Sequence, residues 1–240
     1  MAIPREARRI TYSTDIRNRK RIQLDEYQKA IIVGSLLGDA CLHDNWSKTN
    51  SRLQIRHSLA QKEYVMWKYE ALKSLVLTGP QHYGRTNSVW FRTISHPDLT
   101  KLHEIFYRDG KKIIPEDVIV AFLSNPITVA VWFMDDGNAV MRKGKLCGYH
   151  LNTQSFTRGE NELLAEVFLA LYEISCTVEK NHGYYRLAIW QEPSRKKFSH
   201  LIQEYILPSL KYKISSIGDS SSPVETSPLT GGMAMTVMSP

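Results

Sequence analysis

Two apolar segments of this chain each extend over the length of a helix and end at an aspartate. They cover residues 24–39 and 128–136, and their apolar spacing predicts helices that are buried on most sides. Other segments, such as residues 52–56 and 184–190, alternate polar with apolar side chains. A period of two predicts strands of a sheet that packs one face on a core and exposes the other to water.

The predicted elements follow the same order twice, which indicates an α+β fold built as an αββαββα duplication. The first set is a helix over 24–39, strands near Cys41 and over 52–58, a helix over 61–77, a hairpin over 81–95 that turns at 86–88, and a helix from Pro97. The second set is a helix over 128–136, strands on either side of Lys143-Gly144, a helix over 158–173, a hairpin over 176–191 that turns at His182-Gly183, and a helix from Pro193.

A constant sequence offset supports the duplication. Asp39 and Asp136 lie 97 positions apart, and residues 58–63 align with residues 155–160 at the same offset. One offset across two separate elements is hard to obtain by chance, so we expect two pseudo-symmetric halves whose antiparallel sheets form a saddle. The predicted boundaries are a basic arm over 1–23, a first half over 24–110, a linker over 111–126, a second half over 127–214 and a disordered tail over 215–240.

The charge of the chain narrows the choice of partners. The formal net charge is +7, and residues 1–214 hold all 31 Lys and Arg but only 22 of the 24 Asp and Glu. Such a basic region indicates a polyanionic partner such as nucleic acid, although an anionic membrane surface or simple solubility also fits.

Three widely spaced cysteines without zinc-ligand spacing predict reduced, intracellular thiols. No apolar run is long enough to span a bilayer, so we expect no membrane insertion, and a location in a bacterial cytoplasm or an organelle matrix.

The aspartates at the two helix ends are the candidate chemical groups. A carboxylate at a helix C-terminus costs roughly 0.3 to 1 kcal/mol against the macrodipole, and the chain has this arrangement twice. Small residues before them, namely Gly34, Ser35, Gly38 and Ala130, allow the two helices to approach closely. Two adjacent carboxylates repel unless a divalent cation such as Mg²⁺ or Mn²⁺ lies between them. The simpler alternative is a pair of surface caps before turns, which a single Asp-Gly favours and the repeat does not.

These residues resemble a known family. Residues 32–40 and 129–137 resemble the two signature helices of the LAGLIDADG homing endonucleases, in the single-chain, two-motif branch encoded by mobile introns. Residues 110–115, 151–156 and 207–213 resemble further segments of that branch in the same order. The first motif departs from the pattern at Leu37 and Ala40, and the second at Val131, where a small residue is usual.

The resemblance implies a monomeric endonuclease that recognises a long site in double-stranded DNA and hydrolyses one phosphodiester per strand across the minor groove. It implies Mg²⁺, or Mn²⁺ as a substitute, at Asp39 and Asp136, with Lys112 and Lys213 as basic catalytic residues beside them, and Asp135 in a supporting role. The family reads DNA in the major groove with its sheets. The residues predicted to contact DNA are Gln54, Arg56, Arg85, Arg92, His150, Asn152, Gln154, Lys180, Asn181, His182 and Arg186.

Other functions fit part of the pattern. An RNA maturase that binds intron RNA during splicing, or a non-cleaving DNA-binding protein of the same fold, would share the motifs. Both helix-end aspartates are present, which favours cleavage. An unrelated basic RNA-binding domain would not explain the ordered motifs, and a phosphatase that uses an Asp-Asp pair lacks further carboxylate and His ligands at recognisable spacing.

Overall fold

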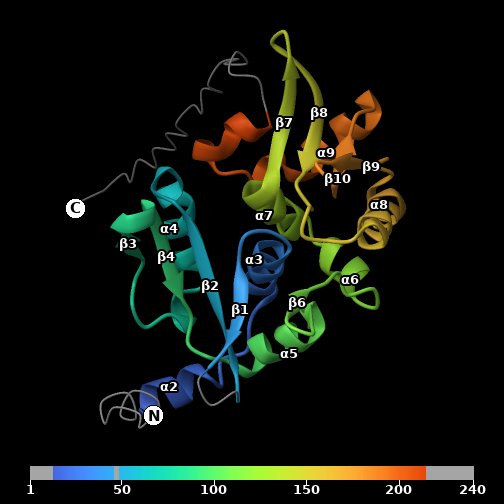
Figure 1. Cartoon of the computed structure of the whole chain (residues 1–240). Helices are drawn as coiled ribbons and strands as arrows, with labels where there is room; N and C mark the ends of the chain where they lie inside the picture. The colour runs from blue at the N-terminus through green and yellow to red at the C-terminus, as the bar shows by residue number, and fades with distance from the viewer. Residues whose placement is uncertain (1–12, 46–48, 215–240) are drawn as a thin grey trace, which may run out of the picture.

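The first αββαββα half follows the predicted order of elements (Figure 1). The computed structural model describes residues 13–45 and 49–214. The elements of the first half are α3 (Glu26–Leu37), β1 (Cys41–Asp44), β2 (Ser51–Ser58), η1 (Leu59–Gln61), α4 (Lys62–Ala71), η2 (Lys73–Leu75), β3 (Gln81–Tyr83), η3 (Gly84–Thr86), β4 (Ser88–Arg92) and α5 (Pro97–Phe106).

The second half repeats this order. Its elements are α7 (Pro126–Asp136), β7 (Gly137–Arg142), β8 (Lys145–Leu151), α8 (Arg158–Tyr172), β9 (Thr177–Asn181), β10 (Tyr184–Ile189), α9 (Glu192–Ile202), η4 (Gln203–Tyr205) and η5 (Pro208–Lys213). The antiparallel sheets have matching strand orders, β1-β2-β4-β3 and β7-β8-β10-β9. The predicted α+β class and duplicated αββαββα order are therefore confirmed.

Local sequence signals explain where many elements begin and turn. A capping box of Asp25 and Gln28 starts α3, and one of Thr157 and Glu160 starts α8, because each side chain satisfies a free N–H of the first helical turn. The hairpins turn at Lys143-Gly144 and His182-Gly183, where both residues of each pair have positive φ. Two-residue turns of this kind match the twist of the paired strands.

Three predicted segments differ from the structure. The helix predicted over 61–77 ends at Ala71, where the guanidinium of Arg19 donates to carbonyls of the following η2 segment. Arg19 belongs to α2 (Thr14–Arg19), whose Ile16 is buried, so the predicted arm contributes to the fold. The predicted linker contains β6 (Lys111–Lys112) and α6 (Ile119–Leu123), and it contributes apolar side chains to the core. Most of the predicted arm, residues 1–12, and the predicted tail lie outside the described residues.

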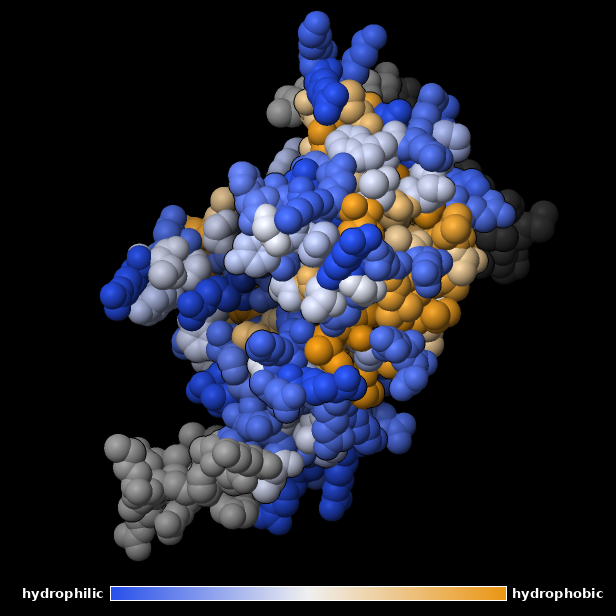
Figure 2. Space-filling view, turned by 45° about the vertical axis from the view of Figure 1, so that its right-hand side comes forward, coloured by the Kyte–Doolittle hydropathy of each residue, from blue (hydrophilic) through white to orange (hydrophobic). Residues whose placement is uncertain are grey.

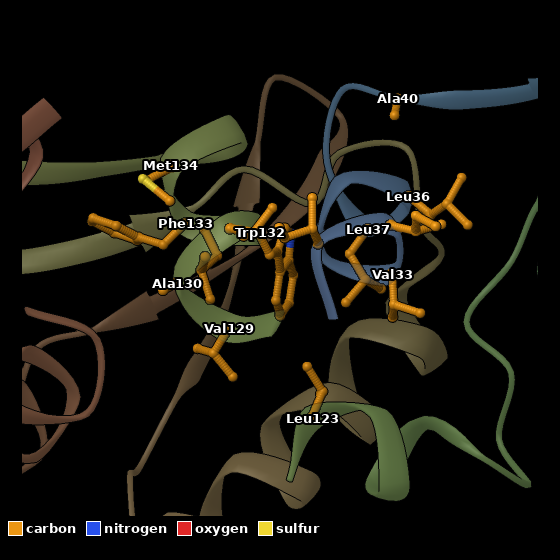
Figure 3. Close-up of a cluster of buried hydrophobic side chains, with 14 of the residues drawn as sticks. Val33, Leu36, Leu37, Ala40, Leu123, Val129, Ala130, Trp132, Phe133 and Met134 are labelled. Carbon is orange, nitrogen blue, oxygen red and sulfur yellow. The ribbon is translucent and has the colours of Figure 1, made fainter. Parts of the chain in front are cut away.

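Helices α3 and α7 lie together in the middle of the molecule, between the two sheets (Figure 1). Their side chains form one buried cluster with Leu123 of α6, in which Trp132 of α7 points toward Leu37 of α3 (Figure 3). A Cβ added at Gly34 would lie 2.6 Å from the carbonyl oxygen of Thr128 and 2.7 Å from Cβ of Val131. Glycine is therefore required where the two helix backbones cross.

The surface is largely hydrophilic in the view of Figure 2, with one hydrophobic patch. Among the large apolar side chains that remain exposed are Val120 of α6 and Leu169 of α8. Within residues 13–45 and 49–214, no helix has the length and apolar character needed to cross a membrane.

The helix crossing can be tested by changing Gly34. We expect Gly34→Ala to lower the free energy of unfolding by about 1 to 3 kcal/mol, because the new methyl group overlaps α7. The control is Gly159→Ala in α8, where an added Cβ has no neighbour within 4 Å and should be neutral or stabilise by up to about 1 kcal/mol. Urea unfolding measures both, and equal effects would contradict the close approach.

Candidate active site

Asp39 and Asp136 occupy equivalent places at the ends of the two central helices. Gly38 ends α3 with its N–H bonded to the Gly34 carbonyl, and Asp39 follows it directly. Asp136 is the last residue of α7, and the side-chain amide of Asn152 donates to its carbonyl at 2.7 Å. A Cβ at Gly38 would lie 2.4 Å from Cβ of Asp135. The two helix ends therefore meet beside Asp39 and Asp136, which explains the electrostatic coupling between these two carboxylates.

Lys112 and Lys213 each bind the backbone at one of these helix ends. The ammonium of Lys112 donates to the carbonyls of Gly38 and Ala40, both at 2.9 Å. The ammonium of Lys213 donates to the carbonyls of Met134 at 2.5 Å and Asp135 at 3.0 Å. A cation is favourable at the negative end of a helix, so these contacts offset the aspartates placed there.

Short elements that follow α5 and α9 position both lysines. Lys112 follows a tight turn between β5 (Tyr107–Arg108) and β6, and the Tyr107 hydroxyl of this hairpin accepts the N–H of Leu42. Lys213 ends η5, and the Tyr149 hydroxyl donates to the carbonyl of the next residue, Ile214. The structure thus brings all four predicted catalytic residues to the two helix ends.

The carboxylates have different electrostatic environments. Burial, together with the carboxylates of Asp39 and Asp135, raises the pKa of Asp136 to about 7, and Lys112 and Lys213 oppose this change. The pKa of Asp39 is lowered, chiefly by its hydrogen bond to His57. Burial lowers the pKa of both lysines, and the surrounding aspartates oppose this change.

Carboxylate oxygens and an excess of negative charge around Asp136 suit a hard divalent cation. Asp39, His57 and Asp135 also form a compact group whose ligand atoms lie within 4.8 Å of one another. The ammonium of Lys68, however, lies 2.7 Å from Oδ1 of Asp135 and 3.3 Å from Nε2 of His57. Because this ammonium neutralises Asp135, the carboxylates of Asp39 and Asp136 are the better candidates for metal ligands.

Sequence reasoning missed three residues at this site. Tyr64 and Lys68 of α4 are fully buried and donate to Asp135, and Nδ1 of His57 lies 3.4 Å from Oδ2 of Asp39. One signal was available for His57, because it follows Leu53 and Ile55 in the inward phase of its strand. A polar residue in an apolar phase indicates a buried contact. Asp135 has the supporting place predicted for it.

The outer face of the first sheet gathers three of the four DNA contacts predicted there. Gln54, Arg56 and Arg92 lie on this face, since they alternate with the core residues Leu53, Ile55 and Phe91. The same face includes residues that were not predicted, namely Arg52, Trp90 and Tyr83, and Arg56 lies over the Tyr83 ring at 5.6 Å. Arg85 is exposed in η3 at the tip of the hairpin. An open hollow of about 570 Å³ connects this face with Asp39.

The outer face of the second sheet is less basic. Arg186, His150 and Asn181 lie on it, together with Glu179, which was not predicted. Glu179 accepts hydrogen bonds from Arg186 at 3.3 Å and from the Trp190 indole at 2.6 Å. The Glu179 carboxylate therefore partly neutralises the positive charge on the outer face of the second sheet.

The four remaining residues predicted to contact DNA lie on the edge strand β9, just after β8 and at a hairpin tip. Lys180 is in phase with Val178, which places it on the face that packs on the helices. Asn152 is engaged with the carbonyl of Asp136, and Gln154 lies beside it. His182 is at a hairpin tip with φ of 49°. Of these four residues, strand phase places Lys180 on the opposite face, whereas Asn152 donates to Asn138, the strand partner of His150 on the outer face.

Similarity to known proteins identifies the family of this chain. The model of the LAGLIDADG DNA endonuclease family matches residues 29–198. The chain belongs to this family. A probable intron-encoded endonuclease 1 of Wickerhamomyces canadensis is 26% identical over 80% of this chain and 85% of its own length. A cytochrome b mRNA maturase bI2 of Debaryomyces hansenii is 29% identical over 80% of this chain and 75% of its own length. The predicted family resemblance is confirmed.

A solved LAGLIDADG structure has the same architecture. The homing endonuclease I-WcaI, bound to its DNA recognition sequence, superposes with a TM-score of 0.77 at 25% identity, over 85% of this chain and 93% of that one. In this chain the departure of the LAGLIDADG motif at Val131 is compensated across the helix pair. Val131 faces Gly34, so one glycine provides the space for both backbones.

The raised pKa of Asp136 predicts a pH-dependent effect of Asp136→Asn on stability. The folded metal-free protein holds the proton of this carboxyl up to about pH 7, whereas the unfolded chain loses it near pH 4. Its contribution to stability is therefore fully present below pH 4 and is lost as the pH rises through 7. We expect Asp136→Asn to raise Tm at pH 8 and to raise it less at pH 5. Thermal unfolding across this range, without metal or DNA, measures the difference, and a gain independent of pH would contradict the assignment.

Proposed function

We propose that this LAGLIDADG protein is a site-specific endonuclease that recognises a long DNA site and hydrolyses one phosphodiester in each strand across the minor groove. The observation that carries the proposal is that a lysine binds the backbone carbonyls at each of the two helix ends that carry an aspartate. Asp39 is accompanied by Lys112, and Asp136 by Lys213, at matching ends of α3 and α7. Two equivalent sites so close together suit two cuts in opposite strands.

The aspartates and the lysines would have different roles in cleavage. Asp39 and Asp136 would hold divalent metal, with Mg²⁺ expected and Mn²⁺ a substitute, and the metal when bound supplies Lewis-acid activation of water and stabilises the leaving oxygen. Lys112 and Lys213 keep the carbonyls at the helix ends in place and present positive charge toward the phosphate. Preorganised cations of this kind stabilise the charge that develops in the transition state.

The outer faces of the two sheets are the proposed DNA-reading surface. On the first sheet Arg56, Arg92 and Gln54 can bond base edges, since arginine matches guanine and glutamine matches adenine. The second sheet contributes Arg186, His150 and Asn181. Support comes from I-WcaI, which has the same fold and was solved with its DNA recognition sequence. We propose that the protein acts as a monomer, since each half supplies one aspartate. We also propose an intracellular location, which the widely spaced cysteines indicate.

A role as an RNA maturase is the second candidate, because the matching Debaryomyces hansenii protein is named a cytochrome b mRNA maturase. Such a protein would bind intron RNA and assist splicing. The two activities can be separated, since splicing assistance would not require the carboxylates of Asp39 and Asp136.

The aspartates can be tested with Asp39→Asn and Asp136→Asn. The substrate is a duplex that carries the joined exon sequence of an intron-free host gene. We expect each variant to lower the rate of double-strand cleavage with Mg²⁺ by more than about 100-fold, because each removes a charged metal ligand. Binding to the duplex in Ca²⁺ is the control for folding. Wild-type cleavage rates in both variants would show that these residues are not the metal ligands.

The lysines can be tested with Lys112→Met and Lys213→Met. We expect cleavage to slow by about 100-fold while the affinity for the duplex changes much less, because the charge acts mainly on the transition state. The matched control is Lys111→Met, since Lys111 is the exposed neighbour of Lys112 on the same short strand. A variant that loses affinity but not the rate of the bound complex would make that lysine a phosphate contact.

A further inference from the structure

A fully buried group of charged and polar side chains supports Asp39 from the first half of the molecule. Asp135 and Lys68 have no exposed side-chain surface, and their Oδ1 and Nζ atoms lie 2.7 Å apart. The Tyr64 hydroxyl donates to the same Oδ1 at 2.6 Å. The other oxygen of Asp135, Oδ2, accepts the backbone N–H of Asp39 at 3.2 Å. Asp135 thus connects α4 and α7 with Asp39, which follows the Gly38 cap of α3.

This cluster has no equivalent in the second half. At the offset of 97, Tyr64 corresponds to Asn161, Lys68 to Ala165, and Asp135 to Gly38. Asn161 bonds Thr153 within its own half. Gly38 has no side chain that could accept the N–H of Asp136. The second aspartate is instead the last residue of α7, and Asn152 holds its carbonyl.

Loss of the buried ion pair would affect the position of Asp39 and not that of Asp136. A buried ion pair is costly to break from one side, since the remaining charge is left without a partner in a medium of low dielectric constant. Removing Lys68 would therefore displace the side chain of Asp135, and Asp135 is the acceptor that holds the Asp39 backbone. No comparable contact would change at Asp136.

We propose that Lys68 and Tyr64 are positioning residues that act through Asp135 on Asp39 alone, so that the two strand cuts depend differently on this cluster. This inference rests on the proposed function, because it assigns one strand cut to each aspartate. Neither residue needs to touch DNA or metal. Their effect is on the position of one carboxylate relative to the other.

The first test needs no catalysis. Amide hydrogen exchange, followed by NMR in the protein without metal or DNA, reports the bond from the Asp39 N–H to Asp135. We expect exchange at Asp39 to accelerate by about tenfold in Tyr64→Phe and by more in Lys68→Met. Exchange at Asn152, whose N–H is bonded to the Asp136 carbonyl, should stay within twofold. Unchanged exchange at Asp39 in both variants would overturn the proposal.

The second test compares the two strands in one reaction. A duplex with a different label on each strand gives both cleavage rates, and their ratio cancels any loss of folded protein. We expect Lys68→Met to change this ratio by about tenfold, since a small misplacement of a reacting group is costly, and Tyr64→Phe to change it less in the same direction. Thr153→Val is the matched control, because it removes the buried contact of the Tyr64 counterpart, and its ratio should stay within twofold.

The outcomes separate this proposal from the proposed function. Equal slowing of both strands in Lys68→Met and Tyr64→Phe would show a general structural role and overturn the inference. If Lys68→Met does not fold, Tyr64→Phe decides, since the loss of one hydroxyl leaves the ion pair intact. If the wild-type protein cuts no duplex, the proposed function fails, and the exchange measurement still decides whether Lys68 and Tyr64 position Asp39.

Discussion

The close crossing of α3 and α7 is the constraint on which the rest of the structure depends. Gly34 and Gly38 bring the backbone of α3 against Thr128, Val131 and Asp135 of α7. This contact forms the centre of the core and also places Asp39 near Asp136. Stability and the candidate chemistry therefore share one interface, and a larger side chain at either glycine would disturb both.

The crossing brings more negative charge together than a buried site normally holds. Three carboxylates, Asp39, Asp135 and Asp136, interact at the helix ends, and burial together with the other two carboxylates raises the pKa of Asp136 to about 7. The chain compensates with three lysines that come from different elements. Lys68 neutralises Asp135 from α4, whereas Lys112 and Lys213 bind helix-end carbonyls from the short segments that follow α5 and α9. The charge that remains at Asp39 and Asp136 is available to a divalent cation.

Duplication has not kept the two halves alike. The sheets share one strand order, but the first outer face carries Arg52, Arg56 and Arg92, whereas Glu179 partly neutralises the second. The buried cluster that Tyr64 and Lys68 of the first half form with Asp135 of α7 likewise has no counterpart at the other aspartate. A pseudo-symmetric site in a single chain can diverge in this way, because each half changes independently. A DNA site without twofold symmetry suits such a protein.

The sequence alone determined the order of elements, the duplication and the two aspartates. These features follow from signals that can be recognised in the sequence alone, namely apolar periodicity, turn pairs such as His182-Gly183 and the offset of 97. Only the tertiary structure decided that α6 and Ile16 join the core, that Lys180 leaves the outer-face set, and that Lys68 is the partner of Asp135. Those facts depend on the packing of segments far apart in the chain, and a buried lysine looks the same in a sequence as a solvated one. The physical reason is that burial and pairing are properties of neighbours in space, which periodicity does not specify.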